Sequence, residues 1–96
     1  MRRRMGRPCL RRKVNFNPKI RYFKPHGIRM FNLEEVELKK EELEAIRLRY
    51  IKNFDQRKCA KLMKTSPATL QRILSSANHK LATALVHGKA IKIINE

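Results

Sequence analysis

Apolar residues in the second half of the chain recur at the spacing of an α-helix. The longest run places them at i, i+3, i+4, i+7, i+11 and i+15, namely Leu70, Ile73, Leu74, Ala77, Leu81 and Leu85. Ser66 is a favoured N-cap, Pro67 loses no hydrogen bond at the first helical position, and Gly88 is a natural C-terminal stop. The pattern predicts a helix over 67–87, the longest element of the chain.

Two shorter helices are predicted before it. Residues 38–50 predict the first helix, because Leu43 and Tyr50 fall on one helical face. The charged residues of this segment lie where they complement the helix dipole. Acids crowd the first turns and bases follow, namely Glu41, Glu42 and Glu44, then Arg47, Arg49 and Lys52. Asp55 can cap a second helix over 56–63. The acidic start of the first of these helices should point away from any phosphate backbone.

The remaining segments are extended or irregular. Residues 90–94 are rich in β-branched side chains and predict a short strand. Residues 1–29 hold prolines and glycines that exclude a helix, namely Gly6, Pro8, Pro18, Pro25 and Gly27. The expected fold is mainly α, with a three-helix core over 30–96, a basic, irregular N-terminal arm over 1–29, and one or two short β-strands.

Residues 56–75 fit a helix-turn-helix, in which the second helix of the pair enters the major groove of DNA. The buried positions of such a motif are all small or apolar here, namely Cys59, Ala60, Met63, Leu70 and Ile73. Lys64 departs from the pattern, because the turn usually has glycine there and a positive φ costs lysine about 1 kcal/mol. The alternative is an ordinary helical hairpin in a helical core.

The charge of the chain is strongly positive and unevenly placed. In 96 residues, Lys and Arg number 24 against 8 acids, which gives a formal charge of +16. Residues 1–29 carry +11, 30–54 carry −1, and 55–96 carry +6. Such a field favours nucleic acid as the partner, with double-stranded DNA preferred. An RNA-binding or ribosome-associated protein and a binder of anionic membrane surfaces are the alternatives.

The start of the longest helix is small and polar on its outer side, and no acid occurs over 56–95. We expect this turn to read bases, with Gln71 on adenine, Arg72 on guanine, and the methyl groups of Ala68 and Thr69 near thymine. Four residues are expected to bind phosphate, namely Lys64, Ser66, Arg57 and Lys58. A merely solvated helix face is the alternative.

The arm offers further DNA contacts. Its basic residues are Arg2, Arg3, Arg4, Arg7, Arg11, Arg12 and Lys13. The order Gly6-Arg7-Pro8 resembles hooks that lie in an A·T-rich minor groove, and a disordered basic tail with non-specific phosphate contacts is the alternative. The strand over 91–94 has no obvious internal partner. We therefore expect a homodimer, held by that strand or by a helix end with Leu81, Leu85 and Val86.

Other functional classes find little support in the sequence. No paired carboxylates, activated nucleophile or phosphate-cradling glycine loop is present, so we expect no enzyme and no small-molecule substrate. Cys9 and Cys59 form no CxxC and the histidines are scattered, so no metal or cofactor is expected, and Cys59 is expected in the core. No apolar stretch is long enough to span a membrane, and we expect a cytoplasmic protein.

Three stretches resemble a known family. They are RRKVNFNPKIRYFKPHGI, LKKEELEAIRLRYI and SPATLQRILSSANHKLATALVHGKAI, and together they cover nearly the whole chain. They resemble a small prokaryotic family called domain of unknown function 134, whose members are described as predicted DNA-binding proteins. The helix-turn-helix of that family is similar to region 4 of sigma-70 factors. The resemblance implies DNA binding, as in a transcriptional regulator, and names no operator or effector.

Overall fold

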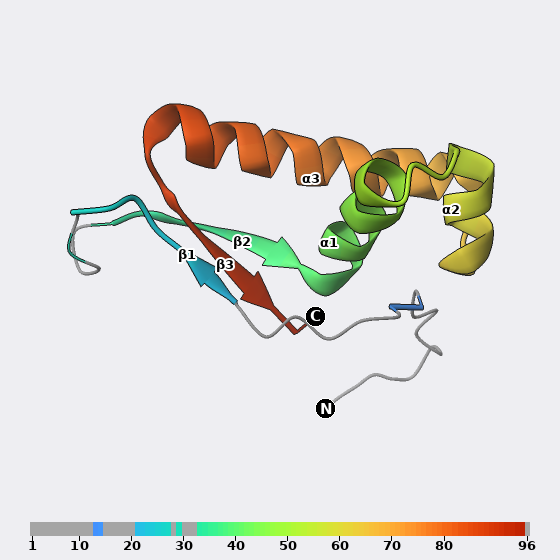
Figure 1. Ribbon diagram of the computed structural model, residues 1–96, viewed down its shortest axis with the longest axis horizontal. Helices are drawn as coiled ribbons and strands as arrows, with labels where there is room; N and C mark the ends of the chain where they lie inside the picture. Colours follow the sequence, from blue (N-terminus) through green and yellow to red (C-terminus); the bar gives the residue numbers. More distant parts are fainter. Residues whose placement is uncertain (1–12, 15–20, 28, 30–32, 96) are drawn as a thin grey trace.

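The computed structural model describes residues 13–14, 21–27, 29 and 33–95. In chain order, its elements are β1 (Tyr22–Phe23), β2 (Glu35–Lys39), α1 (Lys40–Ile46), the π-helical segment η2 (Arg47–Ile51), α2 (Gln56–Leu62), α3 (Pro67–His87) and β3 (Ala90–Ile94). Figure 1 shows α3 lying over a small sheet, with α2 beside the N-terminal end of α3, beyond the sheet.

The sheet has β3 at its centre. Its order is β1-β3-β2, and β3 is antiparallel to β1 and parallel to β2. Two parallel strands need a long crossover connection, and here every helix of the described chain lies within it. The sheet therefore joins the two ends of the helical layer, with Leu38 of β2 opposite Ile93 of β3.

The fold is thus mixed α/β, and the expectation of a mainly α protein is corrected. The prediction of one or two strands missed β2, and the predicted helix over 38–50 begins two residues late, at Lys40. In β2, Val36 and Leu38 turn inward while Glu35, Glu37 and Lys39 are exposed. This period of two is typical of a strand with one buried face. Leu38 therefore belongs to the sheet and not to the helix.

The sheet also removes one basis for the expected homodimer. The strand predicted over 90–94 is confirmed, but β3 pairs with β2 along its whole length and with β1 at Ile91 and Lys92. The premise that this strand lacks an internal partner is wrong. Its pairing partner β2 lies more than 50 residues earlier in the chain, where local sequence patterns give no sign of it.

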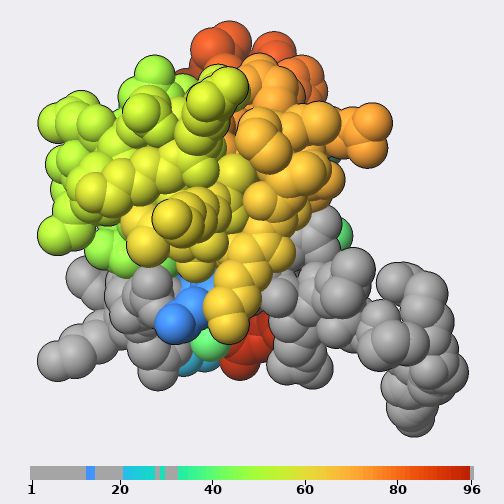
Figure 2. All heavy atoms as spheres, turned by 90° about the vertical axis from the view of Figure 1, so that its right-hand side faces the viewer, coloured from blue at the N-terminus to red at the C-terminus, as the bar shows by residue number. Residues whose placement is uncertain are grey.

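Two clusters of buried side chains are joined by α3. The first lies between the helices and contains Ala45, Leu48, Cys59, Ala60, Met63, Leu70, Ile73 and Leu74. The second lies between α3 and the sheet and contains Leu38, Ala77 and Ile93. Figure 2 looks at the α2 end, where α2 and its turn (yellow) pack against α3 (orange). One face of α3 thus fixes both α2 and the sheet.

The predicted apolar stripe of α3 is confirmed as far as Leu81. Leu85 was expected to extend it, but this side chain is 79% exposed, and Ala84 is buried in its place. The helix ends as predicted, with Gly88 in the left-handed conformation at φ 67°. Its start is also confirmed, because Ser66 Oγ accepts a hydrogen bond from the Thr69 N–H at 3.1 Å.

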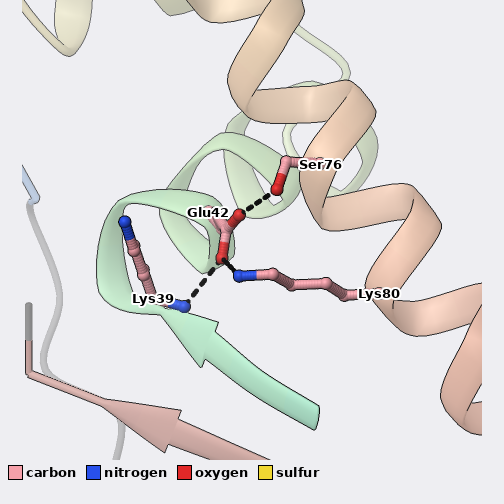
Figure 3. A network of polar contacts seen from close by, with 4 residues as sticks. All are labelled: Lys39, Glu42, Ser76 and Lys80. Atoms are coloured by element: carbon pink, nitrogen blue, oxygen red, sulfur yellow. Dashed lines mark hydrogen bonds and ion pairs between the residues drawn. The ribbon is translucent and has the colours of Figure 1, made fainter.

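Glu42 has a larger role than the helix-dipole effect predicted for it. It is 3% exposed, and its carboxylate accepts hydrogen bonds from Ser76 Oγ at 2.6 Å and Lys80 Nζ at 2.8 Å, both on α3 (Figure 3). The Lys39 N–H at the start of α1 also donates to it at 2.8 Å. Burial raises the pKa of Glu42, but these hydrogen bonds outweigh burial and the pKa is lowered overall. Glu42 therefore ties α1 to α3 while it is ionised.

Glu44 is likewise turned inward. Its side chain is fully buried, and it accepts two hydrogen bonds from the Arg47 guanidinium, at 2.7 Å and 3.0 Å. Such a two-point contact compensates the burial of both charges. Two of the acids at the start of α1 are therefore neutralised inside the fold.

Candidate nucleic-acid interface

A tight turn joins α2 to α3. The Thr65 N–H donates to the Ala60 carbonyl at 2.9 Å, and Ser66 then caps α3. Asp55 caps α2 as predicted, because its carboxylate accepts a hydrogen bond from the Lys58 N–H at 2.8 Å. Lys64 adopts the left-handed conformation at φ 57°, which was predicted from its place in the turn.

The positions expected to pack the two helices together are all buried. They are Cys59, Ala60, Met63, Leu70 and Ile73, each exposed by 7% or less. Ala60 lies in the cluster shared by α2 and α3, where a small side chain allows close approach. Cys59 is fully buried, as expected of a core residue, and this burial raises the pKa of its thiol.

Three of the expected base-reading residues share the outer side of α3. Ala68, Gln71 and Arg72 are exposed, and they lie three and four positions apart, which places them on one helix face. Thr69 is half-buried, and its hydroxyl oxygen accepts a hydrogen bond from Ser66 Oγ at 3.0 Å. Thr69 is therefore partly committed to the helix start.

Gln56, at the start of α2, was not predicted to belong to the candidate site. Its amide Nε2 donates to Gln71 Oε1 at 2.7 Å. The contact orients the Gln71 amide and leaves its NH₂ group available on the outer side. A sequence signal existed, because Gln56 is the first residue of the motif and is polar and uncharged, with the basic residues Arg57 and Lys58 directly after it.

The expected phosphate-binding residues lie on the outer side of α2 and the turn. Arg57, Lys58 and Lys64 are exposed and line a hollow of about 660 Å³, together with Lys13, Asp55, Lys61 and Leu62. Lys58 Nζ lies 4.0 Å from the centre of the Phe54 ring, a cation–π distance. Ser66 is exposed, but its hydroxyl donates to Thr69, so it must rotate before it can donate to phosphate.

Of the arm residues, only Lys13 lies within the described chain. Arg2, Arg3, Arg4, Arg7, Arg11 and Arg12 lie outside the described residues. The Lys13 N–H donates to the Met63 carbonyl at 3.1 Å, at the end of α2. In Figure 2, residues 13 and 14 (blue) lie directly against the yellow residues of α2 and the turn.

In the described parts of the chain, no group of three or more His, Cys, Asp and Glu residues is placed to hold a metal ion. No helix in those parts is long and apolar enough to cross a membrane. At the end of α3, Leu85 and Val86 are exposed, whereas Leu81 packs against the sheet cluster. Of the helix-end residues expected at a dimer interface, two are therefore available on the surface.

Comparison with known proteins identifies relatives of unknown activity. The family model "Protein of unknown function DUF134" matches residues 1–96. A "UPF0251 protein" from Desulforudis audaxviator is 51% identical over 89 residues, covering 93% of this chain and 58% of the relative. Another, from Halothermothrix orenii, is 47% identical over 88 residues, covering 92% of this chain and 65% of the relative.

A third relative, UPF0251 protein TTE1845 from Caldanaerobacter subterraneus subsp. tengcongensis, is 51% identical over 89 residues, covering 93% of this chain and 75% of the relative. The chain thus spans less than two thirds of the length of the first two relatives. No solved structure matches the chain significantly.

Proposed function

The chain belongs to the family described as Protein of unknown function DUF134, and we propose that it binds double-stranded DNA sequence-specifically through α2 and α3, as a helix-turn-helix transcriptional regulator. The observation that carries the proposal is the geometry of the turn between α2 and α3 and the packing of the two helices beside it. Lys64 is left-handed at φ 57°, and the five packing positions on either side of it are buried. An ordinary helical hairpin does not require that combination.

The outer side of α3 supplies groups that match base edges. The Gln71 amide can make a bidentate pair with adenine, and the Arg72 guanidinium can pair with the O6 and N7 of guanine. Ala68 is exposed and small, so the helix can approach the groove closely there. These three residues form the base-reading face in this proposal.

The distribution of charge supports the same orientation. No acid occurs over 56–95, so α3 carries no carboxylate that would repel phosphate. Glu42 and Glu44 are buried and hydrogen-bonded to cations of the chain itself. The exposed acids Glu35 and Glu37 lie on β2, which Figure 1 shows on the opposite side of α1 from α2. Asp55 is an exposed acid at the start of α2, where its carboxylate caps the helix. DNA bound at α2 and α3 therefore meets an almost purely positive surface.

The proposal includes pairing of two copies. A single helix-turn-helix reads a short site, and two-fold pairs read half-sites about 34 Å apart. Leu85 and Val86, 79% and 77% exposed, support a contact at the end of α3. Sedimentation at micromolar concentration should give twice the 11.4 kDa chain mass, and an exclusively monomeric species removes the dimer. A regulator of this kind acts in the cytoplasm.

A competition experiment tests the choice of nucleic acid. Labelled duplex DNA is bound at fixed salt and challenged with equal masses of unlabelled duplex DNA or structured RNA. We expect the duplex DNA to displace the label at lower concentration, because an α-helix enters the major groove of B-DNA but not that of A-form RNA. Stronger displacement by RNA overturns the proposal in favour of an RNA-binding protein.

A further inference from the structure

The hollow on the outer side of α2 brings together a cation from the N-terminal arm and cations from α2 and its turn. Its lining includes one acidic residue, Asp55, and five basic residues, namely Lys13, Arg57, Lys58, Lys61 and Lys64. Asp55 is engaged at the start of α2, where it caps the Lys58 N–H. Within the described residues, no carboxylate pairs with Lys13, Arg57, Lys61 or Lys64. The hollow therefore carries a strong excess of positive charge, with five cations against one carboxylate.

We propose that this hollow holds the phosphodiester backbone of one DNA strand beside the groove that α3 enters, with Lys61 and Lys13 as phosphate-binding residues on its two walls. The inference rests on the proposed function and extends it to residues outside the base-reading face. The name "phosphate hollow" is used below for the surface lined by Lys13, Arg57, Lys58, Lys61 and Lys64.

The spacing of the cations along α2 suits a nucleic-acid backbone. Arg57 and Lys61 lie four positions apart and so stand one above the other on the same side of the helix. From Arg57 to Lys61 the helix advances about 6 Å, at roughly 1.5 Å per residue. One strand of B-DNA advances about 3.4 Å per phosphate. The separation of Arg57 and Lys61 along α2 is therefore close to the rise of two nucleotides.

Lys13 forms the second wall because its backbone is fixed there. Its N–H donates to the Met63 carbonyl, so the residue is held at the C-terminal end of α2. The side chain remains exposed and lines the same hollow as Lys61 and Lys64. A phosphate in the hollow is thus met by a cation from the arm and by cations from α2.

Lys58 is held at the same surface by an aromatic ring. Its Nζ lies over the face of Phe54, 4.0 Å from the ring centre, while Phe54 itself packs against the core. This contact restrains a long side chain that otherwise loses conformational entropy on binding. The phosphate hollow is therefore partly organised before DNA arrives.

The test measures how binding depends on salt. Lys13→Ala, Lys61→Ala and the double variant are compared with wild type on a preferred duplex and on a random duplex, from 50 to 200 mM salt. Lys92→Ala is the control, because Lys92 is an exposed lysine of β3, outside the hollow. Alanine retains the backbone N–H of residue 13, so the hydrogen bond to Met63 persists. Circular dichroism confirms that each variant is folded.

Each single variant should lose one phosphate contact. The slope of log K against log [salt] should then become shallower by about 0.9 for each, and by about 1.8 for the double variant. Between 50 and 200 mM salt, the affinity of each single variant should fall by a factor that is about 3.5 times smaller than the factor for wild type. The weakening should be equal on both duplexes, since phosphate contacts carry no sequence information. Lys92→Ala should retain the wild-type slope.

Two results overturn the inference while leaving the proposed function standing. One is a wild-type slope in both Lys13→Ala and Lys61→Ala when wild type binds DNA. The other is an equal loss of slope in Lys92→Ala, which would assign the effect to net charge alone. Absence of any binding of wild type to duplex DNA instead overturns the proposed function, and the phosphate hollow with it.

Discussion

Replacing Lys64 by glycine should make the protein more stable and weaken its binding to DNA. Lys64 has a φ of 57°, in the left-handed region that side chains with a Cβ disfavour. Glycine adopts this conformation without that strain. The same substitution removes an exposed cation from the phosphate hollow. Stability and binding should therefore move in opposite directions.

The size of the stability gain follows from two opposing terms. Left-handed backbone costs a residue such as lysine about 1 kcal/mol. Glycine loses more conformational freedom on folding, at a cost of about 0.7 kcal/mol. The Lys64→Gly variant should thus gain about 0.3 kcal/mol, and its melting temperature should rise by roughly 1–2 °C for a domain of this size.

Thermal and denaturant unfolding of both proteins measure the gain. Asn53→Gly is the matched control, because Asn53 also has a positive φ of 59° but does not line the hollow. Asparagine tolerates the left-handed region, so its replacement should change stability by less than the Lys64 substitution. DNA affinity should fall for Lys64→Gly only. A Lys64→Gly variant that is less stable than wild type, with the fold retained, would refute the assignment of strain to this turn.

Three further variants test the packing and the interface. Glu42→Gln should destabilise the fold by about 1–3 kcal/mol, because the ionic bond to Lys80 is lost. The pKa of Glu42 is lowered in the folded protein. Its contribution to stability is therefore present above the unfolded pKa and is lost as the pH falls through the folded pKa. The free energy of unfolding, measured against pH, should show this loss at acid pH in wild type and a smaller loss in Glu42→Gln. Ala60→Leu should cost about 1–3 kcal/mol in urea unfolding, because this 2%-exposed residue lies between packed helices, and an unchanged midpoint would contradict that packing. Gln56→Ala should reduce affinity for the preferred site while the salt slope stays unchanged, since it removes the hydrogen bond that orients Gln71 and no charge; equal losses on random duplex would contradict this role.

The helices of the candidate interface could be predicted because their signals are local. Asp55 caps α2 and Ser66 caps α3 through backbone amides three residues ahead, and the apolar spacing of Leu70, Ile73 and Leu74 is that of a helix face. The strain at Lys64 could also be predicted, since the turn geometry itself demands a positive φ. Such features depend on residues within a few positions of one another.

The parts that were missed depend on distant residues. Leu38 looked like the start of a helix because acidic and then basic residues follow it in the order that suits a helix dipole. Its place in β2 is instead fixed by pairing with Ile93 of β3, 55 residues later. Glu42 looked like a dipole-complementing acid, and its partners Ser76 and Lys80 lie 34 and 38 positions away. Leu85 continued the helical pattern past the point where the core ends. Helical spacing specifies which residues share a face, and the neighbouring elements decide how far that face is covered.

The candidate site shows the same division. Ala68, Gln71 and Arg72 were expected on the outer face of α3, and all three are exposed there. The hydrogen bond between Gln56 and Gln71 and the position of Lys13 at the end of α2 come from tertiary structure. The roles of all these residues in binding DNA stay predictions.

Selection of bound sites from a random duplex pool is the most direct test of sequence-specific DNA binding. Wild type should enrich a short motif, repeated with two-fold symmetry at a centre-to-centre spacing of about 34 Å if two copies pair. Gln71→Ala and Arg72→Ala should each relax the preference at different positions of that motif, at a cost of about 1–3 kcal/mol on the preferred site. A pool that remains random after selection with wild type, or a motif unchanged in both variants, would contradict the assignment of base reading to this face of α3.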